Sequence, residues 1–104
     1  MTPQEHWKKV KSRARGLFGL APFRLVEKSE PDREVLQVFL LGDSVLVATL
    51  YFNPQNPFIG CEYLTHGQIV VEHFKIVDEK IEEGQLGRDL FSRLEQIFCE
   101  HEPR

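Results

Sequence analysis

The stretch VLQVFLLGDSVLVATLYF, residues 35–52, decides the fold of this chain. Val35–Leu41 and Ser44–Phe52 are rich in β-branched and aromatic residues, and Gly42-Asp43 between them suits a two-residue hairpin turn. Apolar side chains fall on both faces of the first run: Val35, Phe39 and Leu41 on one face, and Leu36, Val38 and Leu40 on the other. Strands with two apolar faces belong in the middle of a sheet that is covered on both sides.

Weaker strand patterns lie on both sides of this hairpin. We expect strands at Phe23–Lys28, near Cys61–Leu64 and at Gln68–Val77. Turn-forming residues separate them at Ser29–Asp32 and Thr65–Gly67. The sequence therefore predicts an antiparallel meander of four to five strands.

The N-terminal segment has the signals of a helix start. Thr2 can cap the helix, Pro3 suits its first position, and Glu5 lies three residues past the cap. The apolar residues that follow recur at helical spacing: Trp7, Val10, Ala14, Leu17 and Phe18. These signals predict a helix over residues 3–17.

The C-terminal segment predicts a second helix, which starts after Gly84–Gly87 and ends near Glu102. Its core-facing residues are Leu90, Phe91, Leu94, Ile97 and Phe98. The chain is thus expected to be a single α+β domain over residues 1–104. Two helices leave three ways to cover the sheet: one helix on each face, both on one face with a partner on the other, or a homodimer.

Composition places the chain among globular cytoplasmic proteins. It has 104 residues, of which 41% are hydrophobic and 28% charged, as is ordinary for a folded domain. The N-terminus lacks the apolar segment of a signal peptide, and no run of about 20 apolar residues predicts a membrane span. Cys61 and Cys99 have no metal-binding spacing and form no disulfide framework. We therefore expect two reduced thiols, a cytoplasmic location and no membrane contact.

The N-terminal helix is basic although the chain carries a net charge of −3. Its cations are Lys8, Lys9, Lys11, Arg13 and Arg15. They are candidate partner-binding residues, and three interpretations stay open. The first is a solvated face, or a helix docked on an acidic patch of its own chain or of a partner. The second is binding of a protein partner, and the third is neutralisation of nucleic-acid phosphates.

Catalytic and metal-binding patterns are sparse. Cys61, His66 and His73 are close in sequence but lack the spacing of a metal site, so no metal is predicted. Glu72 is a carboxylate among apolar residues of a predicted strand, which makes it a weak candidate general base if burial raises its pKa. A position at the sheet edge or a salt bridge is the alternative.

The segment Gly84–Arg88 follows the long predicted strand and precedes the last helix, where backbone amides favour a bound anion. Residues 68–102, with EGQLGRDLFSRLE (residues 83–95) at their centre, resemble the central strand, phosphate loop and helix of the GNAT superfamily of acetyl-CoA-dependent N-acetyltransferases. The resemblance implies acetyl-CoA as cofactor and Glu72 or a water as base. It implies that the pyrophosphate lies on Gln85, Leu86, Gly87 and Arg88. A glycine-containing turn before a core helix is the alternative.

These patterns predict a non-catalytic interaction module, of the adaptor, inhibitor or immunity type, that binds a protein partner or its own copy through the sheet or the basic helix. An acetyl-CoA-binding acyltransferase relative is the first alternative. A nucleic-acid-binding accessory protein that uses the basic helix is the second.

Overall fold

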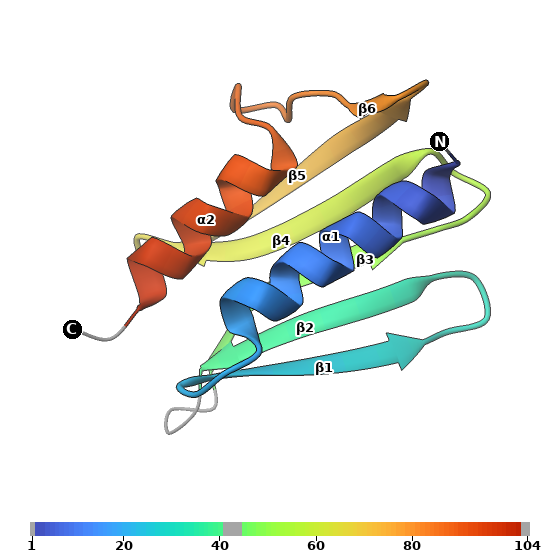
Figure 1. Cartoon of the computed structure of the whole chain (residues 1–104). Coiled ribbons are helices and arrows are strands. Elements are labelled where there is room, and N and C mark those ends of the chain that lie inside the picture. The colour runs from blue at the N-terminus through green and yellow to red at the C-terminus, as the bar shows by residue number, and fades with distance from the viewer. Residues whose placement is uncertain (1, 41–44, 103–104) are drawn as a thin grey trace.

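The computed structural model describes residues 2–40 and 45–102. The chain runs from a helix through six strands to a second helix (Figure 1). The elements are α1 (Pro3–Phe18), β1 (Phe23–Ser29), β2 (Glu34–Leu40), β3 (Val45–Phe52), β4 (Phe58–Thr65), β5 (Gln68–Val77), β6 (Lys80–Ile81) and α2 (Leu90–His101). The predicted α+β class is confirmed.

The strands form one antiparallel sheet in the order β1-β2-β3-β4-β5-β6, so each strand pairs with its neighbours in sequence. The predicted meander is confirmed, but its expected count of four to five strands is wrong. The missed strand, β6, has two residues that pair with the end of β5, and so short a strand has no periodic signal. β4 also begins at Phe58 instead of near Cys61.

The start of α1 follows its sequence signals. Thr2 caps the helix, its hydroxyl accepting the backbone N–H of Glu5 at 3.3 Å, and Pro3 occupies the first turn. The helix ends at Phe18, one residue beyond the prediction. Its expected apolar face is buried except for the half-buried Leu17.

Tight turns hold the register of the hairpins. His66 and Gly67 connect β4 to β5 with φ angles of 49° and 76°, and positive φ at both central residues is the geometry that favours glycine in such turns. The predicted turn at Gly42-Asp43 lies outside the described residues.

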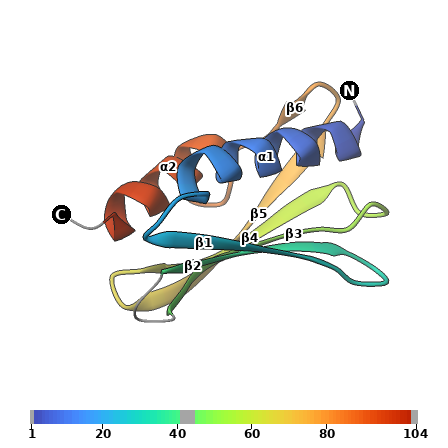
Figure 2. The same ribbon diagram turned by 60° about the horizontal axis from the view of Figure 1, so that its bottom comes forward.

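Both helices pack on one face of the sheet (Figure 2). The core lies between them and that face, where Trp7 of α1 stacks on Phe52 of β3 with ring centroids 5.6 Å apart. Phe18 meets Phe23 edge to face at 5.1 Å. Within the described part of the chain, no helix packs on the opposite face. Of the three predicted arrangements, the chain thus has both helices on one side, and it covers only one face of its central strands.

Neither helix in the described ranges is both long and apolar enough to cross a membrane.

Candidate interaction surface

The strand register separates the two faces of the sheet, because directly paired residues of antiparallel strands point to the same side. One row of paired residues points toward the helices and is fully buried: Leu36, Leu50, Cys61 and Glu72. The next row points away from them: Val26, Gln37, Thr49, Glu62 and Val71. We call the side of β1–β5 that carries this second row the open face.

Large apolar side chains lie exposed on the open face. Leu46, Ile69 and Val71 are 42%, 74% and 45% exposed. Leu46, Leu64 and Ile69 line one shallow depression of about 40 Å³. An apolar patch that spans three neighbouring strands is typical of a contact surface.

Two aromatic rings on the open face each have an arginine guanidinium over them. Tyr51 lies over Gly60, where an added Cβ would come within 2.0 Å of the ring, and the Arg33 guanidinium lies 5.4 Å from the Tyr51 centroid. Arg24 lies 5.1 Å from the centroid of Phe39. Burial, with the nearby Glu62 charge, raises the pKa of Tyr51. Rigid aromatic and arginine side chains are enriched at protein interfaces.

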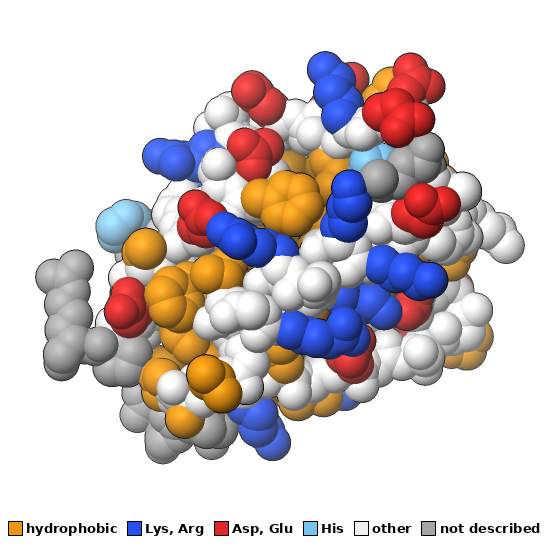
Figure 3. Space-filling view, in the orientation of Figure 1, with side chains coloured by type: hydrophobic (Ala, Val, Ile, Leu, Met, Phe, Trp, Pro, Cys, Tyr) orange, Lys and Arg blue, Asp and Glu red, His pale blue; other side chains and the backbone are white. Residues whose placement is uncertain are grey.

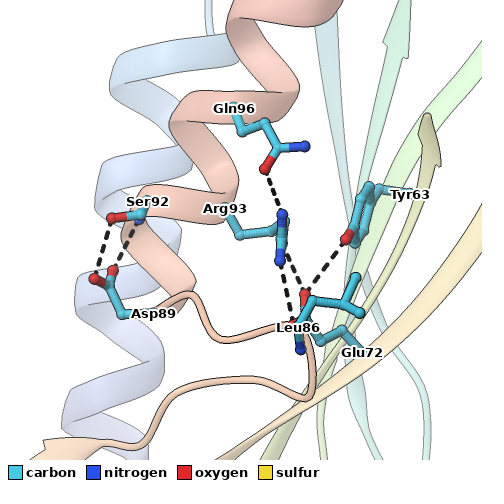
Figure 4. Close-up of polar contacts among 7 residues, drawn as sticks. All are labelled: Tyr63, Glu72, Leu86, Asp89, Ser92, Arg93 and Gln96. Atoms are coloured by element: carbon cyan, nitrogen blue, oxygen red, sulfur yellow. Dashed lines mark hydrogen bonds and ion pairs between the residues drawn. The ribbon is translucent and has the colours of Figure 1, made fainter. Parts of the chain in front are cut away.

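A buried ion pair lies on the helix-covered face (Figure 4). Arg93 of α2 donates to Glu72 of β5, with Nε at 2.8 Å from Oε1 and Nη2 at 3.3 Å from Oε2. The Tyr63 hydroxyl donates to Oε1 at 3.4 Å, and Gln96 accepts from the other Arg93 nitrogen. Of the alternatives for Glu72, the structure has the salt bridge, and the carboxylate is 0% exposed.

The segment Gly84–Arg88 wraps around this same carboxylate. The backbone N–H of Leu86 donates to Glu72 Oε2 at 3.0 Å, and a Cβ at Gly84 would lie 2.3 Å from that oxygen. The Gly87 amide donates to the Gly84 carbonyl at 3.0 Å. Two of the four amides that the GNAT resemblance assigns to a pyrophosphate are therefore engaged within the chain. One of them already holds an anion, the chain's own Glu72.

α2 begins after this loop, at Leu90. Asp89 caps it by accepting the Ser92 N–H at 2.8 Å, and this backbone hydrogen bond lowers the pKa of Asp89. The carboxylate of Asp89 thus occupies the helix N-terminus, where the sequence suggested a bound anion.

The basic residues of α1 lie on the helix-covered side (Figure 3), and three of the five pair with glutamates of the chain. Lys11 lies 3.5 Å from Glu34, Arg15 lies 2.8 Å from Glu27, and Arg13 pairs with Glu95 of α2. The Arg15 hydrogen bond lowers the pKa of Glu27. The interpretation of a helix docked on its own chain thus holds for these three cations.

Lys8 and Lys9 differ from the other cations of α1. Both are exposed, and neither has an ion pair within residues 2–40 and 45–102. Lys9 borders a hollow of about 690 Å³ between the helices, which Leu17 and Phe91 also line. Of the five cations of α1, these two are the ones that no ion pair holds in the described ranges.

The cysteines and histidines are dispersed. Both thiols are free, with Cys61 buried and Cys99 exposed, and burial raises the pKa of Cys61. His66 and His73 are exposed, in the β4–β5 turn and on the open face. In the part of the chain that the structure describes, no three histidine, cysteine or acidic side chains are grouped to hold a metal ion.

Two features escaped the sequence analysis. The first is Arg93, which interrupts the apolar face of α2 between Leu90 and Leu94. A charged residue in that position indicates an ion pair with a buried carboxylate of the same chain. The second is which face of the sheet is exposed. The sequence analysis did not predict it, although Ile69 and Val71 alternate with the buried positions of β5. The position of the open face depends on the packing of both helices to one side, which local patterns do not encode.

Comparisons of this chain with protein-family models, with the curated proteins and with the solved structures gave no match.

Proposed function

We propose that this protein is a non-catalytic interaction module that binds protein through the open face of its sheet. The observation that carries the proposal is the packing of both helices on one side, which leaves exposed apolar residues on the other. Ile69 is 74% exposed on a strand whose opposite face is buried. Covering this surface with a partner releases water from apolar area.

The kind of exposed side chain favours protein over nucleic acid as the partner. The most exposed apolar residues of the open face are aliphatic, namely Ile69, Val71 and Leu46. Single-stranded nucleic acid is bound by stacking of bases on exposed aromatic rings, whereas Phe39 and Tyr51 are half-buried and already covered by arginines. Aliphatic side chains gain by packing against a protein core of similar chemistry.

Site-specific photo-crosslinking in intact cells tests the proposal. A photoreactive phenylalanine analogue replaces Ile69 on the open face, and in a matched variant it replaces Leu20, which is 82% exposed on the helix side. We expect protein adducts from position 69 and none from position 20. A third variant carries the analogue at Lys8 and reports on the basic helix. Adducts from position 8 with none from position 69 would move the contact to α1 and refute the proposal.

A thermal melt tests the alternative that the GNAT resemblance implies. A protein that binds acetyl-CoA melts at a higher temperature when the cofactor is present. A ligand at a hundred times its Kd adds about 2.7 kcal/mol, which raises Tm by on the order of 10 °C in a domain of this size. The backbone amides of Leu86 and Gly87 already donate to the Glu72 carboxylate and the Gly84 carbonyl. We therefore expect no shift in Tm at millimolar acetyl-CoA. A shift of several degrees, absent with free adenosine diphosphate, would favour the acyltransferase interpretation.

A further inference from the structure

We propose that the partner of the open face is the same face of a second copy, related by a two-fold axis that runs along β3 between the two sheets. This inference rests on the proposed function and names the partner. It follows from how the exposed residues are distributed over the five strands β1–β5, of which β3 is the middle one.

The register makes the central row of the open face complementary to itself. A two-fold axis along β3 places β1 over the partner's β5 and β2 over the partner's β4, and it keeps each row of paired residues over the same row. In the row through Thr49, Val26 then meets the partner's Val71, and Gln37 meets the partner's Glu62. Apolar residues face apolar ones, and the amide of Gln37 donates to a carboxylate.

The neighbouring rows add apolar contacts at the axis. Tyr51 meets the partner's Tyr51 on one side of Thr49. On the other side, Leu46 meets the partner's Leu46 and Phe39 meets the partner's Leu64, and at the edge of this row Arg24 lies over the partner's Ile69. Apart from that edge pair, these residues lie on the three central strands, where the small angle between two packed sheets displaces facing residues least. The apolar and aromatic contacts therefore flank a central polar row, in which the partner's Gln37 covers the Glu62 carboxylate.

Charge selects this axis over the perpendicular one. An axis across the strands through the Thr49 row would place β4 over the partner's β4 and bring Glu62 against the partner's Glu62, which is repulsive. The axis along β3 brings Glu62 to the partner's Gln37 instead. The partner's β1, with the cations Arg24 and Lys28, then lies beside that pair.

The size of the open face suits a dimer. Five strands about 4.8 Å apart, each with about seven residues that rise about 3.4 Å, give a flat footprint of roughly 600 Å². The relief of the side chains adds to this value. Specific interfaces bury about 800 Å² of accessible surface on each partner, so the face reaches that size when all five strands take part and the side-chain relief adds about a third to the flat footprint.

Sedimentation analysis of the purified, reduced protein in a dilution series from millimolar to micromolar concentrations tests the proposal. We expect the unmodified protein to sediment as a dimer at the upper end of the series and to dissociate on dilution. Val71→Lys should make the protein monomeric, because the new ammonium would lie against the partner's Val26, with the partner's cations Arg24 and Lys28 close by. In the free subunit, the neighbouring Glu62 of β4 can pair with this ammonium, so the fold tolerates the change. Leu20→Lys, the control on the helix side, should remain dimeric. Circular dichroism checks that both variants fold.

A second pair of variants tests the axis. Leu46→Lys places two cations against each other at the axis and should also give monomers. Gln37→Lys places a cation against the partner's Glu62 at two symmetric positions, so the dimer should tighten by roughly tenfold. The combination of Gln37→Lys with Glu62→Gln should lose that gain. Weaker or unchanged dimerisation of Gln37→Lys would overturn the proposed axis.

The outcomes separate self-pairing from the broader proposed function. A monomeric unmodified protein, or a dimer that survives Val71→Lys and Leu46→Lys, overturns self-pairing. If position 69 still crosslinks to another protein in cells, the interaction module stands with a different partner. If position 69 gives no adduct of any kind, the proposed function fails as well.

Discussion

At the scale of single residues, the ion pair between Glu72 and Arg93 gives the sharpest prediction. Their side chains are 0% and 4% exposed. Removing one member of a buried pair leaves the other charge without compensation and costs about 3–5 kcal/mol. We therefore expect Glu72→Gln to lower the free energy of unfolding by about that amount in urea denaturation. Replacement of both residues, as in Glu72→Gln with Arg93→Met, should cost less than Glu72→Gln alone. A single-variant cost below about 1 kcal/mol would show that the pair is solvated.

The two cysteines give a second prediction. Cys61 is 0% exposed and burial raises the pKa of its thiol, whereas Cys99 is exposed on α2. Because the thiolate is the reactive form, a thiol reagent should modify one cysteine in the native protein and two in denaturant. Cys99→Ser should abolish the native reaction and Cys61→Ser should leave it unchanged. Rapid native modification at Cys61 would contradict its burial.

Residue roles were predictable from the sequence where they depend on neighbours along the chain. The Thr2 cap and the alternation around Glu72 were visible in it. The partner of Glu72 was not, because Arg93 reaches it only after α2 packs on the sheet. The anion at the Gly84–Arg88 amides is a side chain of β5, and no local pattern distinguishes it from a bound phosphate.

At the scale of elements, two glycines, one in α1 and one in the loop before α2, should respond in opposite ways to the same substitution. Gly84 packs against Glu72, where a Cβ would lie 2.3 Å from Oε2, whereas nothing lies within 4 Å of a Cβ at Gly16 in α1. We expect Gly84→Ala to destabilise the fold by about 1–3 kcal/mol through overpacking. Gly16→Ala should stabilise it by about 0.5–1 kcal/mol, because alanine loses less backbone entropy in a helix. Thermal or urea unfolding checks both, and equal effects would refute the close approach at Gly84.

The helices and the long strands could be predicted because each has ten or so residues of consistent periodicity. Gln68–Val77 matches β5, and the predicted N-terminal helix differs from α1 by one residue. β6 has two residues and no such signal. The side of the sheet on which a helix packs is not set by its own amphipathic pattern, since either face of β2 and β3 offered apolar residues.

At the scale of the whole molecule, two helices and one sheet give a two-layer structure with a single covered face. The ion pairs of α1 with glutamates lie on the covered side. The open face presents apolar residues, with Glu62 and the cations Arg24 and Lys28 among them. The sequence patterns pointed to the need for a partner surface but left its position open.

The most direct test of that surface is a dilution series followed by methyl NMR of leucine, isoleucine and valine side chains. The account predicts that the methyl shifts of Ile69, Val71 and Leu46 change between micromolar and millimolar protein, while those of Leu20 remain constant. Concentration-dependent shifts at Leu20 with constant shifts at the three open-face residues would contradict it, and so would constant shifts at all four.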